Sequence, residues 1–178
     1  NIKISALFIT HLHEDHIGGL MYFFRTTGSD CTVYTTKLTY HFLKIKLERA
    51  NLENKIKVEF IESIGSMDDV GAASLIKVGN FIVRPVELTH STPGMNAYLI
   101  SSNEKNPVTV FHTGDWKFDD KPIVGEKSNE TLLKQMGDKG VDAIVCDSTN
   151  VFRKDYPEYE GDLAVSLENI IKQVKVGT

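Results

Sequence analysis

A run of metal-binding residue types directly after an apolar segment is the feature that most constrains this chain. The run reads HLHEDH, so that His11, His13, Asp15 and His16 fall within six positions. The preceding residues 2–10, IKISALFIT, are almost continuously apolar and rich in β-formers, which predicts a buried strand. His11 and His13 stand two apart in extended chain and should point to the same side. Imidazole nitrogens and a carboxylate at one strand end favour zinc, manganese or iron.

Two glycines, Gly18 and Gly19, follow this run inside a helical pattern of apolar residues that should end near Gly28. Each glycine costs on the order of 1 kcal/mol relative to alanine within a helix. Two explanations stay open: a close approach of this turn to another backbone or to the metal site, or a frayed helix start.

Further candidate ligands follow three other predicted strands. His90 follows the strand at 81–88, Asp115 follows the strand at 108–112, and Asp147 follows the strand at 141–146. Beside the first cluster, His90 and Asp115 become expected ligands, because a binuclear site needs a third histidine and a bridging carboxylate. Asp147 stays open between a site residue and an aspartate that caps a turn with its neighbours.

The remaining pattern predicts a mixed α and β chain. Strands are expected at 31–35, 56–61, 74–78, 81–88, 96–101, 108–112 and 141–146, the last of them buried. Helices are expected at 38–50, with Leu38, Phe42 and Ile45 on one stripe, at 129–139, and from near Glu160 onward. A tight turn at Gly79-Asn80 should join two strands as a hairpin. Several strands joined by short turns favour a layered sandwich of sheet and helix over a pure βαβ repeat.

Composition narrows the class of protein. A chain of 178 residues with 41% hydrophobic and 25% charged residues is typical of one soluble domain. No apolar run reaches the ~18 residues of a membrane helix. The net charge of −4 gives no basic footprint for nucleic acid, although bound divalent cations would offset it. The two cysteines, Cys31 and Cys146, indicate a reducing, cytoplasmic compartment and should be buried as small apolar residues.

Taken together, these motifs resemble the metallo-β-lactamase superfamily. The His-x-His-x-Asp-His run carries that likeness. The stretches HS at 90–91, HTGDWK at 112–117 and DSTN at 147–150 are similar to the ribonuclease J-like members of its β-CASP branch, which act on RNA. The likeness extends from Ile2 to the last predicted helix. It implies an α/β (α+β) fold, a partial metallo-β-lactamase αββα sandwich.

The resemblance also implies roles for individual residues. One metal would be held by His11, His13 and His90, and a second by Asp15 and His16, with Asp115 bridging both. Asp15 and Asp115 would orient the attacking water and accept its proton. Asp147 would match the acidic motif that opens the β-CASP region. Candidates for orienting the site or contacting substrate are His112, Lys117, Ser148 and Thr149, and each could equally be an ordinary polar residue of a turn, the core or the solvated surface.

The family pattern includes parts with no match here: two N-terminal strands, the β-CASP domain, a late histidine of the second metal site, and a return segment. Many relatives also carry an acidic residue where this chain has Gly94. We therefore expect residues 1–178 to form a partial domain, truncated before the β-CASP insertion. Two divalent ions, zinc or alternatively manganese, should bind it weakly or in part, and it should show little activity alone.

The expected partner is RNA, with no membrane contact, and a homo-oligomer of the full-length protein stays open. Two alternatives remain beside the ribonuclease: another hydrolase of this fold acting on a thioester or lactam, and a non-catalytic module.

Overall fold

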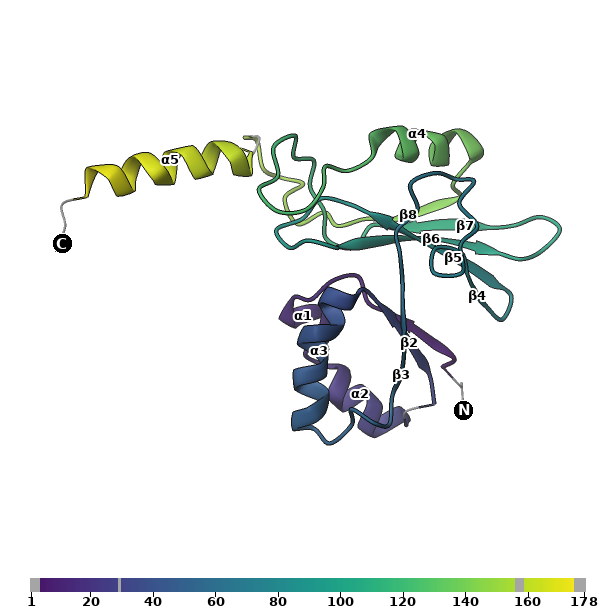
Figure 1. The fold of residues 1–178 in the computed structure, drawn as a ribbon. Helices are drawn as coiled ribbons and strands as arrows, with labels where there is room; N and C mark the ends of the chain where they lie inside the picture. Colours follow the sequence, from purple (N-terminus) through teal and green to yellow (C-terminus); the bar gives the residue numbers. More distant parts are fainter. Residues whose placement is uncertain (1–3, 29, 156–158, 175–178) are drawn as a thin grey trace.

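Two β-sheets pack against each other between outer helices in the computed structural model, which describes residues 4–28, 30–155 and 159–174 (Figure 1). The first sheet is parallel, in the order β1 (Ala6–Phe8), β2 (Thr32–Thr35), β3 (Lys57–Phe60). The second sheet follows chain order through β4 (Ile76–Val78), β5 (Phe81–Glu87), β6 (Asn96–Ser102), β7 (Thr109–His112) and β8 (Ala143–Val145). Its pairs are antiparallel except for β7 with β8. The helices are α1 (Glu14–Ile17), α2 (Leu20–Thr27), α3 (Lys37–Arg49), α4 (Glu130–Lys139) and α5 (Glu160–Gln173).

Three apolar clusters hold these layers together. One joins α2 and α3 to the first sheet, with Phe24, Val33 and Leu43 at its centre. A second joins α4 to the outer face of the second sheet. The third lies between the sheets, where the ring of Phe8 stands edge-on to that of Tyr98 with centroids 5.3 Å apart. This order of helix, sheet, sheet and helix confirms the predicted αββα sandwich.

Local sequence explains the main boundaries. Thr36 accepts a hydrogen bond from Thr39 N at 3.2 Å and starts α3, and Asn129 accepts one from Leu132 N at 3.0 Å and starts α4. The predicted hairpin is confirmed, since Val78 pairs with Phe81 across Gly79-Asn80. The predicted helix after the histidine run is interrupted: α1 ends at Ile17 and α2 begins at Leu20, on either side of the two glycines.

The two glycines differ. A Cβ at Gly18 would lie 2.6 Å from the Glu14 carbonyl oxygen, whereas one at Gly19 would meet nothing within 4 Å. The close approach at Gly18 is therefore to its own turn.

Several burial predictions are wrong, and the sheet edges explain most of them. β1 is half-buried at all three positions, and residues 2 and 3 of the predicted strand lie outside the described residues. Ala143–Val145 are exposed throughout, as is Cys146, while Cys31 is buried as predicted. Each of these strands ends its sheet and has one neighbour, so fewer side chains cover it.

In α3 the predicted stripe is also wrong. The helix buries Thr39, Leu43 and Leu47, and Leu38, Phe42 and Ile45 are exposed. The buried positions recur every four residues and therefore lie on one side of the helix, which packs on the first sheet. The apolar residues Leu38, Phe42 and Ile45 lie off that side and are exposed.

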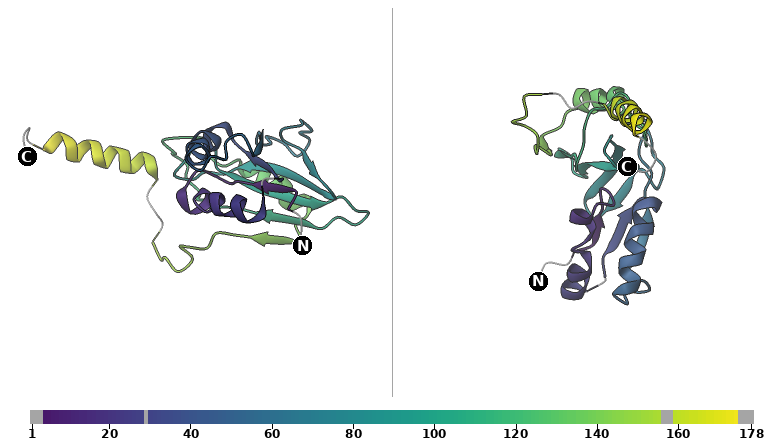
Figure 2. Two further views of the ribbon diagram at one scale, coloured as in Figure 1. Left: turned by 90° about the horizontal axis from the view of Figure 1, so that it is seen from below. Right: turned by 90° about the vertical axis from the view of Figure 1, so that its left-hand side faces the viewer.

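The last helix, α5, extends away from the two sheets (Figure 2). It contains no buried residue, and its apolar side chains Leu163, Leu167 and Ile170 are exposed. Among the described residues, no helix combines the length and apolar character needed to cross a membrane.

Candidate metal centre

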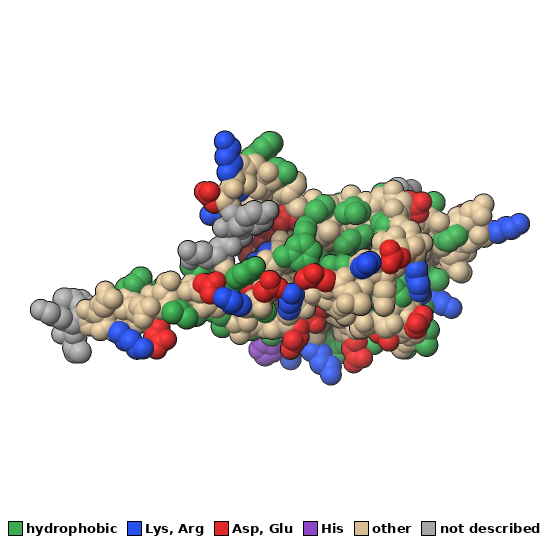
Figure 3. All heavy atoms as spheres, turned by 90° about the horizontal axis from the view of Figure 1, so that it is seen from above, with side chains coloured by type: hydrophobic (Ala, Val, Ile, Leu, Met, Phe, Trp, Pro, Cys, Tyr) green, Lys and Arg blue, Asp and Glu red, His purple; other side chains and the backbone are tan. Residues whose placement is uncertain are grey.

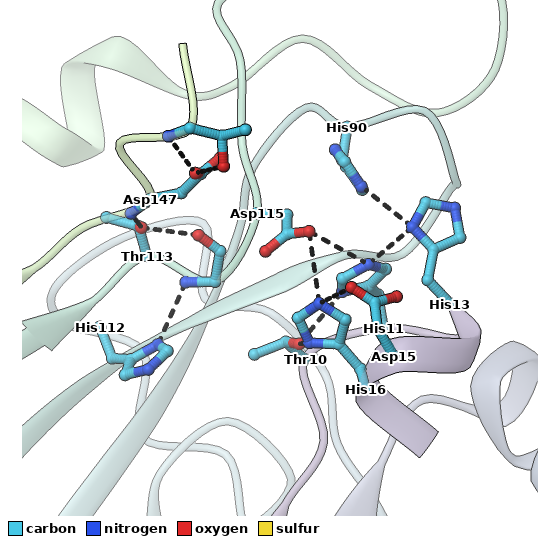
Figure 4. A network of polar contacts seen from close by, with 12 residues as sticks. Thr10, His11, His13, Asp15, His16, His90, His112, Thr113, Asp115 and Asp147 are labelled. Atoms are coloured by element: carbon cyan, nitrogen blue, oxygen red, sulfur yellow. Dashed lines mark hydrogen bonds and ion pairs between the residues drawn. The ribbon is translucent and has the colours of Figure 1, made fainter. Parts of the chain in front are cut away.

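The histidines and Asp115 come from three loops at neighbouring strand ends. β1 leads into residues 10–16, β5 ends just before His90, and β7 ends just before Asp115. His13 is the extended N-cap of α1, with φ −61° and ψ 150°, so the chain turns into the helix there and brings Asp15 and His16 round to the same space. Figure 4 shows these side chains pointing toward one another.

The first group consists of His11, His13 and His90. His11 Nε2 lies 2.9 Å from His13 Nδ1, and His90 Nε2 lies 3.2 Å from the same Nδ1. Two nitrogens bound to one tetrahedral zinc at about 2.0–2.1 Å would stand roughly 3.3 Å apart. The observed spacing is therefore close to that of a shared metal ion.

The second group consists of His11, His16 and Asp115. Asp115 Oδ2 lies 3.3 Å from His16 Nε2 and 3.9 Å from His11 Nε2. In both groups the candidate ligand atoms lie within 4.8 Å of one another. His11 thus belongs to both groups, and its side chain is fully buried between them.

Asp15 lies at the rim of the site. Its Oδ2 is 3.4 Å from His16 Nε2, but 76% of its side chain is exposed and it joins neither group. The pairing of Asp15 with His16 on a second ion stays a prediction, as do the individual ligand roles.

Thr10 is a site residue that sequence reasoning missed. Its Oγ1 lies 3.1 Å from His11 Nδ1 and 3.3 Å from His16 Nδ1. A hydroxyl oxygen has two lone pairs, so it can accept from both Nδ1–H groups. That tautomer leaves both Nε2 lone pairs free to face a cation. The only signal in the sequence was a hydroxyl residue next to the motif, which is too common to be informative.

Electrostatics favour neutral imidazoles at the centre of the site. Burial, reinforced by the neighbouring His16, His90 and His13, lowers the pKa of His11 to about 4. Burial also lowers the pKa of His90. Neutral imidazole is the form that binds metal.

The donor set fits a cation. With His11 Nδ1 donating to Thr10, His11 Nε2 carries a lone pair that points at His13 Nδ1. If His13 Nδ1 carried a proton, that proton could form a good hydrogen bond with only one neighbour. Two nitrogens, His11 Nε2 and His90 Nε2, lie next to it. A metal ion satisfies all three lone pairs together.

Gly114 allows the Asp115 loop to approach Thr10. Its φ is +59°, and a Cβ there would lie 2.8 Å from Met95 Cε and 3.1 Å from Thr10 Cγ2. Only glycine fits both this backbone conformation and this space.

The other sequence candidates lie outside these groups. Asp147 Oδ1 accepts hydrogen bonds from Thr149 N at 2.9 Å and Thr149 Oγ1 at 2.6 Å, which lower the pKa of the Asp147 carboxyl. Asp147 therefore caps a turn with its neighbour, and its place in the acidic motif of the family stays a prediction. His112 Nδ1 accepts from Gly114 N at 3.1 Å, and Ser148 is exposed.

Lys117 is paired with two carboxylates and is not a solvated lysine, and its contact with a phosphate stays a prediction. Its Nζ forms ion pairs with Asp119 at 2.9 Å and Glu160 at 2.6 Å. Trp116 packs against the cluster beneath α4. The helix residue His41 is exposed. Lys44, Lys46 and Lys57 pair with acidic neighbours.

Curated proteins named ribonuclease J are similar to this chain in sequence. Ribonuclease J from Sinorhizobium meliloti is 34% identical over 95% of this chain, and ribonuclease J from Thermus thermophilus is 32% identical over 95%. The chain spans only 28% of the length of each of these curated relatives.

Solved structures share the fold. A protein of unknown function from Enterococcus faecalis superposes with a TM-score of 0.62 at 21% identity, covering 97% of this chain and 40% of that one. The short form of human tRNase Z superposes with a TM-score of 0.54 at 18% identity, covering 95% and 69%. Residues 2–172 match the family described as the beta-lactamase superfamily domain. With its αββα layers and its histidine cluster, the chain belongs to the metallo-β-lactamase superfamily.

Proposed function

We propose that this chain carries the catalytic core of a metal-dependent ribonuclease that hydrolyses RNA phosphodiester bonds. The observation that carries the proposal is the convergence of four histidines and Asp115 from three loops into two overlapping groups of ligand atoms. The relatives named ribonuclease J, at 32–34% identity, support RNA as the substrate.

The expected ions are two divalent cations, zinc or alternatively manganese. When bound, they would lower the pKa of a water molecule and neutralise charge on the phosphoryl oxygens. His11, His13 and His90 would hold one ion, and Asp15 and His16 the other, with Asp115 between them. Asp115 is about one-third exposed, which lets its carboxylate accept a hydrogen bond from a water molecule at the site.

Asp15 is suited to proton transfer at the rim. It lies in the first turn of α1 and is largely exposed, so its carboxylate is open to solvent while its neighbour His16 faces the centre. Thr10 fixes the two imidazoles that flank Asp115. These chain groups would orient the water and the phosphate for in-line attack.

Asp15 gives the sharpest test. The complete gene product containing this sequence is assayed on 5′-monophosphorylated RNA with Mn²⁺ or Zn²⁺, beside Asp15→Ala and Glu14→Ala. Glu14 is the matched control, because it is the adjacent residue in α1 and its side chain is 74% exposed against 76% for Asp15.

We expect Asp15→Ala to lower cleavage at least 100-fold, in line with the loss of a positioned acid or base, and Glu14→Ala to cleave like the unchanged protein. Equal cleavage by all three removes Asp15 from the mechanism. Hydrolysis of a chromogenic lactam or a thioester without RNA cleavage would favour the other hydrolase. A protein that binds neither ion would be the non-catalytic module.

A further inference from the structure

Three charged residues form a cluster where α5 begins, which we name the α5 latch: Lys117, Asp119 and Glu160. Lys117 Nζ lies between the two carboxylates, 2.9 Å from Asp119 Oδ2 and 2.6 Å from Glu160 Oε1. The Asp119 side chain is 2% exposed. Figure 3 shows acidic and basic side chains side by side where α5 leaves the body.

Backbone groups complete the latch. Asp119 also accepts hydrogen bonds from Lys121 N at 2.8 Å and Glu160 N at 3.1 Å, and Glu160 Oε2 accepts one from Ile123 N at 3.1 Å. A buried carboxylate is tolerated only when it is paired and hydrogen-bonded in this way. The loop after Asp115 and the first turn of α5 are therefore fixed to each other.

The same residue connects the latch to the metal centre. Lys117 N donates to Thr89 O at 2.9 Å. Thr89 precedes His90, and Lys117 follows Asp115 by two positions, so this one hydrogen bond ties together the loops that carry His90 and Asp115. His90 belongs to the first ligand group and Asp115 to the second.

The latch also belongs to the attachment of α5 to the body. Within the described part of the chain, the hydrogen bonds from α5 and its N-cap to the body come from residues 159–162, and the remaining turns bury no side chain. A displacement of α5 would therefore be transmitted to the body through this first turn, which includes the latch.

We propose that Lys117, Asp119 and Glu160 are positioning residues through which the placement of α5 sets the geometry of His90 and Asp115. This inference rests on the metal centre of the proposed function. A partner that binds α5 would thereby change the affinity of the site for metal without contacting the metal-ligating residues.

The test is titration with Co²⁺ of the complete gene product containing this sequence, unchanged and as Glu160→Gln, followed by the visible absorption spectrum of the bound ion. Glu160→Gln keeps the size of the side chain and an oxygen for Ile123 N but removes the charge that faces Lys117. Loss of a supporting residue commonly weakens metal binding about 10- to 100-fold, and we expect about 10-fold here, with an altered spectrum. The matched control is Asp162→Asn, which breaks the exposed pair of α5 with Lys121 at 2.8 Å and leaves the latch intact. We expect it to bind Co²⁺ within two-fold of the unchanged chain.

Two further variants guard against a folding defect. Lys117→Arg keeps the cation and should preserve affinity, whereas Lys117→Met keeps much of the aliphatic stem and should lose it. If Glu160→Gln and Lys117→Met bind Co²⁺ with unchanged affinity and spectrum, the latch has no positioning role while the metal centre stands. If the unchanged complete gene product binds no Co²⁺, the metal centre itself is refuted and this inference with it.

Discussion

Gly114→Ala is the most exacting test of how the centre is built. Gly114 has φ +59°, and the added methyl group would lie 2.8 Å from Met95 Cε, 3.1 Å from Thr10 Cγ2 and 3.2 Å from Thr10 Cβ. Met95 is fully buried, and Thr10 is β-branched and held by two histidines, so neither neighbour can move freely.

Two costs add in this variant. A left-handed conformation costs an L-residue roughly 1–2 kcal/mol, and overpacking of a filled interior costs about 1–3 kcal/mol. Gly79 is the matched control, because its φ is +56° and a Cβ there meets nothing within 4 Å. We expect Gly79→Ala to lose about 1–2 kcal/mol and Gly114→Ala about 2–5 kcal/mol of unfolding free energy.

The assay is urea denaturation with a chelator present, so that bound metal adds nothing to the stability of the folded state. The fluorescence of Trp116 reports the transition, since the chain contains a single tryptophan two positions beyond Gly114. Equal losses in the two variants would show that the approach of the Asp115 loop to Thr10 is not tight, and the reasoning about this loop would fail.

Three further predictions follow from the contacts of the site. Thr10→Val should weaken Zn²⁺ binding about 10- to 100-fold, measured by calorimetry, because His11 and His16 lose their common acceptor. The metal-free chain should lose on the order of 3 kcal/mol of stability between pH 6.5 and about 4. Burial and neighbouring imidazoles lower the pKa of His11 from 6.5 to about 4, so the unfolded chain takes up its proton first as the pH falls, and His11→Gln should remove this part of the slope in urea denaturation. Ser128→Ala should cost about 1–3 kcal/mol by denaturation, because Thr89 N, a buried group, loses the hydroxyl oxygen that it contacts at 2.8 Å.

Control variants exist for Thr10→Val and Ser128→Ala. Thr26→Val removes an exposed hydroxyl that bonds only to its own helix and should bind Zn²⁺ normally. Ser148→Ala lies on the surface and should change stability by less than about 0.5 kcal/mol. If the unfolding free energy depends on pH in the same way with and without His11, the lowered pKa of His11 is contradicted. If Ser128→Ala is as stable as the unchanged chain, Thr89 N finds another acceptor.

The sequence predicted the layers and the histidine cluster because both follow local rules. Alternating and apolar runs identified most strands, and ligands at strand ends converge where those strands lie side by side. The structure places His90 3.2 Å from His13, as the strand ends suggested.

The errors arose where long-range packing decides. Val145 is exposed because β8 is an edge strand, and its apolar composition cannot reveal which strands will neighbour it. Likewise, the partners of Lys117 are Asp119 nearby and Glu160, which lies 43 positions away. Spacing alone gave no reason to connect them.

The order of strands in the second sheet has a consequence for assembly. β4, β5 and β6 each pair antiparallel with the next strand in the chain, so this four-stranded meander needs little loop closure and should form early. The centre is different, because His13 and His90 are 77 positions apart and meet only when the two sheets have docked. Binding of a metal ion should therefore be among the last events of folding. It would stabilise the folded arrangement without directing how the chain reaches it.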